Sequence, residues 1–184
     1  MLTNLLCGRK VRLTALDKKD VAAIARWHED TGYLRLLDSR PALPRTEAAV
    51  AEDWIDEAGK ARDRVTFAIR PLDGEELIGT VGIDEIEWTH QVGSLSIGIG
   101  ERKNWCKGYG YEAVQLVLAH AFKELNLHRV QLTVFAYNDA AIALYEKAGF
   151  QREGVFRQFL QRDGERHDMY LYGLLRREWE AGNE

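Results

Sequence analysis

A glycine-containing turn before an amphipathic segment is the first feature of this sequence that could bind a ligand. Lys107, Gly108, Tyr109 and Gly110 form the turn, and apolar residues at helical spacing follow from Val114 onward. The first amides of a helix lack partners inside the helix and carry partial positive charge, and glycine lets an anion approach the backbone. The turn is therefore a candidate phosphate site, although the same residues would also suit an ordinary helix start.

Known phosphate-binding motifs fit this turn only in part. The P-loop pattern GxxxxGK followed by Ser or Thr is missing, whereas the dinucleotide pattern GxGxxA is present at Gly108, Gly110 and Ala113. In a dinucleotide-binding fold the glycines directly follow a strand and several parallel strands come afterwards. Here residues 100–107 separate the turn from the preceding strand, and the remaining pattern is antiparallel in character. The glycines alone are therefore weak evidence for a dinucleotide.

A second polar position precedes a short helix about one strand further on. Asn138 is a suitable N-cap, Leu144 and Tyr145 lie in the helix, and Gly149 ends it before Phe150. For Tyr145 alone, a side chain packed in the core is the simpler interpretation.

Taken together, residues 105–113 and 138–150 closely resemble the two diagnostic blocks of the GNAT acetyltransferase superfamily. In that family the first block has the pattern (Arg/Gln)-x-x-Gly-x-(Gly/Ala). The second block has Asn, then Leu-Tyr a few residues later, and then Gly-Phe. Within that superfamily the sequence is similar to the branch of bacterial N-terminal protein and polyamine acetyltransferases. The residues that carry this similarity are Trp105, the Gly-Tyr-Gly turn and the tail at residues 162–168. One departure is that Trp105 stands where the wider family has Arg or Gln. The amides of the turn would supply most of the anion contacts, with Lys107 adding charge.

The resemblance implies a role for each matching residue. Ile97 and Ile99 would pair through their backbone with the pantetheine arm of acetyl-CoA. The turn amides would hold the pyrophosphate, Asn138 would reach the cofactor, and Tyr145 would protonate the departing thiolate. The cofactor-binding residues implied are Ile97, Ile99, Trp105, Cys106, Lys107, Gly108, Tyr109, Gly110, Asn138 and Tyr145.

Deprotonation of the acceptor amine needs no strong dedicated base if the acceptor is an α-amino group. Such a group has a pKa near 8, against about 10.4 for a lysine side chain. Candidate bases are Ser94, Ser96 and the carboxylates of residues 84–87, where strand alternation would place Glu85 and Glu87 on one face. We favour Glu85, while a solvated strand face remains the simpler interpretation of each carboxylate and a water relay would also serve.

Other reactive residues lack a useful spacing. His28, Glu29 and Asp30 are consecutive and diverge around a helix axis, so no metal site is expected. His167 and Asp168 are neighbours on an expected strand and face opposite sides. Cys106 lies in the pyrophosphate turn, far from the thioester, and is expected to be a bystander.

The elements that must position these residues follow from hydrophobic periodicity and turn signals. The expected class is α+β in one domain, residues 1–184, with a mostly antiparallel twisted sheet flanked by helices, in the order βααβββαβαββ. The resemblance adds a splay between the fourth and fifth strands. Expected strands are 11–14, 65–69, 77–83, 92–99, 130–135, 150–159 and 166–174; expected helices are 17–27, 46–60, 111–125 and 138–149.

Composition narrows the class of partner. The chain of 184 residues has a net charge of −4, two cysteines and no apolar stretch long enough to cross a bilayer. We therefore expect a cytoplasmic protein that binds neither nucleic acid nor membrane, and a homodimer is left open.

The function predicted from these features is transfer of an acetyl group from acetyl-CoA to a primary amine, by direct attack in a ternary complex. The amine could belong to a protein N-terminus, a polyamine or a small molecule. Two alternatives are a non-catalytic acyl-CoA-binding module and a dinucleotide-binding oxidoreductase.

Overall fold

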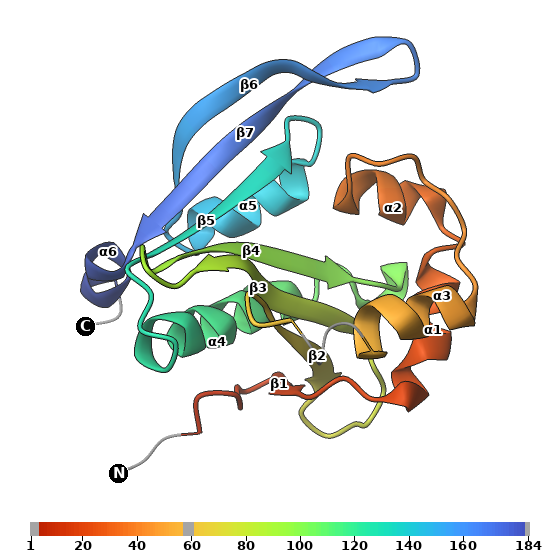
Figure 1. Ribbon diagram of the computed structural model, residues 1–184, viewed down its shortest axis with the longest axis horizontal. Coiled ribbons are helices and arrows are strands. Elements are labelled where there is room, and N and C mark those ends of the chain that lie inside the picture. The colour runs from red at the N-terminus through yellow and green to blue at the C-terminus, as the bar shows by residue number, and fades with distance from the viewer. Residues whose placement is uncertain (1–3, 57–60, 183–184) are drawn as a thin grey trace.

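The computed structural model describes residues 4–56 and 61–182, whose strands form one seven-stranded sheet (Figure 1). The strand order is β1-β2-β3-β4-β5-β7-β6, and every neighbouring pair is antiparallel except β4 and β5. The strands are β1 (Val11–Thr14), β2 (Val65–Pro71), β3 (Gly79–Glu87), β4 (Val92–Ile99), β5 (Arg129–Phe135), β6 (Gln151–Arg162) and β7 (Glu165–Leu175).

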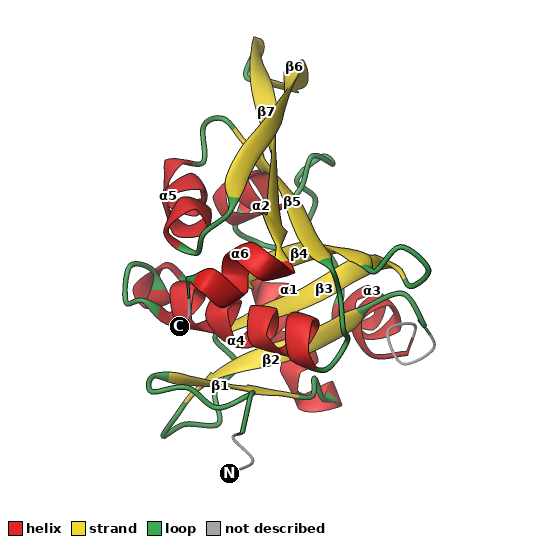
Figure 2. Ribbon diagram, turned by 90° about the vertical axis from the view of Figure 1, so that its left-hand side faces the viewer, coloured by secondary structure: helices red, strands yellow, loops and turns green. Residues whose placement is uncertain are grey.

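Helices cover both faces of the sheet. Figure 2 shows α4 and α5 on one side of the sheet and α3 on the other, and α1 packs in the same layer as α3. Short 3-10 turns occupy Lys18–Asp20 and Arg102–Asn104, and one π-helical turn occupies Glu52–Asp56. The α-helices are α1 (Val21–Trp27), α2 (Thr31–Leu37), α3 (Glu47–Ala51), α4 (Tyr109–Lys123), α5 (Asp139–Lys147) and α6 (Arg176–Ala181).

The alternation of side chains along the strands divides the core into two layers. On β2, Ile69 packs in the layer that holds α4, whereas its neighbour Ala68 packs in the layer that holds α1 to α3. Helix α4 buries Val114, Val117 and Leu118 toward the sheet, at the spacing expected of one helix face. Both faces of the central strands are therefore buried, which fixes the position of the strands that border the cavity described below.

The expected splay between β4 and β5 is confirmed. These strands pair only where Val92–Ser94 meets Arg129–Gln131, and the register goes no further. Beyond Ser94, β4 keeps its antiparallel partner β3 on one side, while its other edge faces the gap toward β5. The main chain of that edge is thus left for another partner.

The expected strands are all present, and the helices differ from expectation in two places. Helices α2 and α6 were not predicted, although Asp30 accepts a hydrogen bond from Tyr33 N and so caps α2. The helix expected at 46–60 begins after Thr46 as predicted, but its α-helical part ends at Ala51, and residues 57–60 lie outside the described part. No helix among the described residues has the length and apolar character that a membrane span requires.

Candidate functional site

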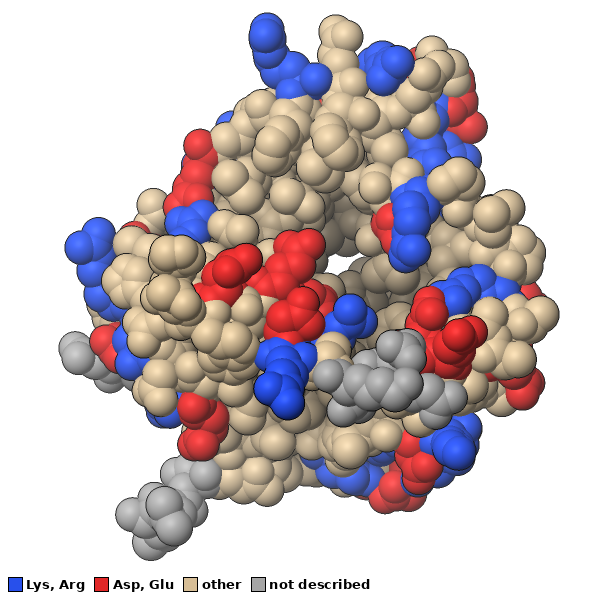
Figure 3. Space-filling model, viewed as in Figure 1, with Lys and Arg blue, Asp and Glu red and all other residues tan. Residues whose placement is uncertain are grey.

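A cavity of about 960 Å³ occupies the gap between the diverging strands. Its walls come from the later residues of β4 and β5, the turn before α4, one side of α5, and residues of α2, β6 and β7. In Figure 3 the surface is hollowed between the β6–β7 hairpin, α2 and β4. All the predicted site residues line this cavity except Lys107.

The turn before α4 is shaped by two residues with left-handed backbone angles. Cys106 has φ of 57° and Gly108 has φ of 84°, and Gly108 directly precedes the first helical residue. Left-handed angles of this kind are cheap for glycine and uncommon for other residues. The turn brings the free amides at the start of α4 to the wall of the cavity, as the phosphate hypothesis requires.

Contacts with the segment that leads into β1 hold the turn in place. The Glu112 carboxylate accepts hydrogen bonds from the backbone N–H groups of Arg9, Lys10 and Val11, at 2.7 to 2.9 Å. Burial alone would raise the pKa of Glu112, but these donors lower it below its usual value. The Lys10 ammonium donates to the Lys107 carbonyl at 2.9 Å. Sequence analysis did not identify this anchor, because its two halves are about a hundred residues apart.

Trp105 joins the turn to the end of β4. Its indole N–H donates to the Ile99 carbonyl at 2.8 Å, and the Arg102 guanidinium lies over its ring. Trp105, the residue that departs from the expected motif, therefore acts here on the protein backbone. The hydrogen bond places the edge of β4 next to the amides of the turn.

Gly110 lies where the start of α4 closely approaches α5 and β4. A Cβ atom at this position would lie 3.2 Å from Leu144 Cδ1 and 3.7 Å from Ile99 Cγ1. A side chain here would therefore fill space that borders the cavity as well as press on α5.

Tyr145 lies on the α5 wall and is 7% exposed. Its ring meets Phe150 edge to face, and burial raises the pKa of its hydroxyl to about 12. Among the described residues no protein group accepts a hydrogen bond from this hydroxyl, and the residue lines the cavity. It is a protonated donor at neutral pH that faces a space large enough for a ligand.

Asn138 caps α5 and also contacts α2. Its side-chain oxygen accepts a hydrogen bond from Ala141 N at 3.3 Å, and its amide donates to the Leu36 carbonyl at 3.4 Å. The expected capping role is therefore present. The contact with α2 adds a link between the two helices that border the cavity.

Glu85 reaches the cavity because β3 bulges there. The register between β3 and β4 shifts between Asp84 and Glu87, and Glu85 takes φ of 51°. Its carboxylate accepts a hydrogen bond from the Ser94 hydroxyl at 3.2 Å, and Asp84 accepts one from Ser96 at 2.5 Å. Glu85 lines the cavity, whereas Glu87 does not.

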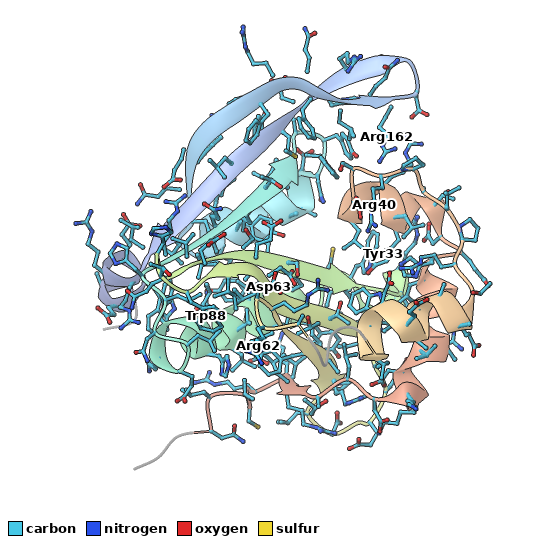
Figure 4. The ribbon with its side chains drawn as sticks, in the orientation of Figure 1. Tyr33, Arg40, Arg62, Asp63, Trp88 and Arg162 are labelled. Carbon is cyan, nitrogen blue, oxygen red and sulfur yellow. The ribbon has the colours of Figure 1, made fainter. Side chains whose placement is uncertain are left out.

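Sequence analysis missed a set of contacts that joins the β6–β7 hairpin to α2 and the segment after it, which we call the Arg162 clasp. The Arg162 guanidinium, at the end of β6, donates to the carbonyls of Asp38, Ser39 and Arg40 at 3.0 to 3.3 Å. Arg35 of α2 forms an ion pair with Asp163 in the hairpin turn. Figure 4 shows Arg162 and Arg40 approaching each other from the hairpin and from the segment after α2.

The apolar residues on this side were also missed. The cavity is lined here by Leu37, Phe156 and Phe159. These residues could not be predicted as neighbours, because their proximity depends on α2 and on the bend of the hairpin toward it. As for metals, residues 4–56 and 61–182 contain no group of three or more His, Cys, Asp and Glu side chains arranged to hold one.

Comparisons with known proteins point to one family. The family model of the acetyltransferase (GNAT) domain matches residues 10–151. An uncharacterised N-acetyltransferase of Bacillus licheniformis, p20, is 26% identical over 174 residues, covering 95% of this chain and 97% of that protein. The spermidine N(1)-acetyltransferase of Vibrio cholerae is 35% identical over 80 residues, covering 44% of this chain and 46% of that protein.

Two solved structures share the fold. The spermidine N-acetyltransferase from Vibrio cholerae, in complex with CoA and spermine, has a TM-score of 0.82 at 23% identity and covers 92% of this chain and 98% of its own. A putative acetyltransferase from T. thermophilus has a TM-score of 0.75 at 32% identity and covers 96% of this chain and 91% of its own.

Proposed function

This chain belongs to the GNAT acetyltransferase family, and from that premise we propose that it acetylates a primary amine by direct attack of the amine on acetyl-CoA in a ternary complex. Acetyl-CoA is the cosubstrate of this family, and it supplies an acetyl thioester. The observation that carries the proposal is the placement of the α4 turn, the unpaired edge of β4 and Tyr145 around one cavity.

Each wall of the cavity has a part in binding. The amides from Trp105 to Gly110 would hold the pyrophosphate, because they combine free donors with the positive end of α4. The backbone at Ile97 and Ile99 would pair with the amide groups of the pantetheine arm, as an added strand pairs with a sheet edge. Asn138 would meet the cofactor from the start of α5.

Tyr145 and Glu85 would handle the protons of the reaction. The amine nitrogen forms a bond to the acetyl carbon, and a backbone N–H of β4 stabilises the oxyanion. The carbon–sulfur bond then breaks, Tyr145 gives its proton to the thiolate, and the amine proton passes to Glu85 or to water. Proton exchange with water then restores the Tyr145 phenol and the Glu85 carboxylate. The products are the N-acetylated amine and CoA thiol.

The cysteines bear on the compartment in which the protein works. Cys7 and Cys106 are both exposed and unbridged, which suits a reducing compartment, and we propose that the protein works in the cytoplasm.

Ligand-induced stabilisation tests the cofactor assignment. Acetyl-CoA and CoA should raise the Tm, whereas NAD and ATP should leave it unchanged, because neither has a pantetheine arm. An equal shift with NAD would overturn the assignment. Catalysis is then tested by measuring the release of CoA thiol with a series of amine acceptors. If acetyl-CoA binds but no acceptor leads to release of CoA thiol, the proposed enzymatic activity is contradicted.

A further inference from the structure

The side of the cavity formed by α2 and β6 is apolar and open to solvent. Phe156 and Phe159 are 45% and 50% exposed, and Leu37 is 37% exposed, yet all three line the cavity. The two phenylalanine rings lie 6.0 Å apart between centroids, and Met169 lines the cavity beside them. Large apolar side chains left in contact with water beside a cavity indicate a surface that a ligand covers. We call Leu37, Phe156 and Phe159 the apolar mouth.

Charge at this side of the cavity is unevenly distributed. Two carboxylates are among the described residues that line it, Asp38 and Glu85. Asp38 is neutralised by Arg40, whose backbone N and Nε donate to it at 2.8 and 2.7 Å, and Arg162 binds the adjacent carbonyls. Glu85 receives only the Ser94 hydroxyl and has no cationic partner among the described residues.

The cavity therefore favours a cation near Glu85 and disfavours one near Arg162. An ammonium group near Glu85 would gain an uncompensated carboxylate. A second ammonium group further along the acceptor would lie near Arg162, whose guanidinium donates to neutral carbonyls and has no ion-pair partner among the described residues, and there it would meet like charge. In Figure 3 acidic side chains gather along one lip of the hollow, and uncharged side chains lie above it.

We propose that the acceptor carries a single amine attached directly to an apolar group, with the amine at Glu85 and the apolar group covering the mouth. This inference rests on the proposed function and narrows its acceptor class. An amine with one alkyl or aromatic substituent fits this arrangement. A polyamine does not fit it, because its second charge would lie where a cation is disfavoured.

Two amines of equal length test the proposal directly. Pentylamine and 1,4-diaminobutane have chains of the same number of heavy atoms and differ in whether the far end is a methyl or an ammonium group. The kcat/KM measured by CoA thiol release should be at least about tenfold higher for pentylamine, the scale of discrimination that an apolar pocket achieves.

Two variants on β6 test whether the apolar mouth causes the preference for pentylamine over the diamine. Phe159→Ser should lower kcat/KM for pentylamine by about tenfold and leave that for the diamine and the KM for acetyl-CoA unchanged. Val155→Ser is the matched control, because Val155 is equally exposed on β6 but does not line the cavity. Both substitutions are on an exposed surface, and urea unfolding should show similar stability.

The outcomes separate the two proposals. Equal or better use of the diamine would overturn the acceptor class alone, as would a Phe159→Ser variant with an unchanged preference. Failure of both amines while acetyl-CoA binds would likewise overturn the acceptor class alone. Failure of acetyl-CoA to bind would overturn the proposed function, and this inference with it.

Discussion

At the scale of single residues, burial gives Tyr145 the protonation state that its proposed role needs. Burial raises the pKa of the hydroxyl to about 12, so the phenol keeps its proton at neutral pH and near pH 8, where an α-amino group begins to be neutral. Tyr145→Phe keeps the ring and its packing against Phe150 but removes the proton. We expect kcat to fall by about 10²-fold, with little change in the affinity for acetyl-CoA, in steady-state and binding measurements.

A buried tyrosine outside the cavity provides the control. Tyr172 donates to the Glu146 carboxylate at 2.8 Å and does not line the cavity. Tyr172→Phe should cost about 1 to 3 kcal/mol of stability and leave kcat unchanged. Full kcat in Tyr145→Phe would show that Tyr145 only packs the core.

Gly110→Asp should weaken CoA binding severely. The substitution adds a Cβ atom 3.2 Å from Leu144 Cδ1 and a negative charge where the phosphates are expected. We expect the Kd for CoA to rise by about 100-fold, equal to about 2.7 kcal/mol, in calorimetric titration.

Two further glycine variants separate charge from crowding. Gly110→Ala adds the Cβ atom without the charge and should weaken binding less. Gly74→Asp adds the charge in a turn outside the cavity, where the Cβ atom would have 3.5 Å to its nearest neighbour, and should leave binding intact. An unchanged Kd in Gly110→Asp would mean that the phosphates bind elsewhere.

At the scale of elements, the Arg162 clasp joins the hairpin to the segment after α2. Arg162→Ala removes the donor to three carbonyls, and hydrogen bonds from charged donors contribute about 1.5 to 3 kcal/mol. We expect the KM for the acceptor to rise by about tenfold, because the apolar mouth loses its support, while the KM for acetyl-CoA stays constant.

Arg157 is the matched control for the clasp. It is an exposed arginine on the same strand that makes no hydrogen bond or ion pair with the described residues. Arg157→Ala should leave both KM values unchanged. A rise in the KM for acetyl-CoA in Arg162→Ala would place the clasp on the cofactor side instead.

The elements that sequence predicted well are those with strong local signals. The α4 turn, the α5 cap at Asn138 and the paired strands follow from glycine, capping and alternation, which are properties of neighbouring residues. The splay between β4 and β5 came from family resemblance. Helix α2 was not predicted, because it is only seven residues long and its start depends on one capping residue, Asp30.

The acceptor side of the site was harder to predict than the cofactor side. The residues of the apolar mouth come from α2 and β6, and their proximity depends on where the hairpin bends. Glu85 faces the cavity because of a bulge, which alternation does not foretell. The anchor between Glu112 and the start of β1 likewise joins distant segments.

At the scale of the whole molecule, buried tyrosines make stability depend on alkaline pH. Burial raises the pKa of Tyr33, Tyr145 and Tyr172 above the value of about 10 in the unfolded chain. The stability that these raised pKa values contribute is complete below pH 10. It is lost as the pH rises toward the pKa values of the folded protein, because in that range the unfolded chain binds fewer protons than the folded protein does. The urea midpoint should therefore be lower at pH 11 than at pH 9.

A tyrosine variant identifies the source of that dependence. Tyr172→Phe is less stable at pH 9 but should show a smaller drop between the two pH values, since one titrating group is gone. Equal midpoints at pH 9 and pH 11 in the original protein would contradict the expected linkage.

The Arg162 clasp also has a consequence for the shape of molecules that reach Glu85. Figure 1 shows the β6–β7 hairpin extending above β4 toward α2, and the contacts of Arg162 and Asp163 join the end of the hairpin to α2 and the segment after it. A slender chain end can pass beneath a hairpin that is held in this way more easily than a lysine on the surface of a folded domain can. We therefore expect that, while the clasp holds, the thickness of an acceptor limits its access to Glu85.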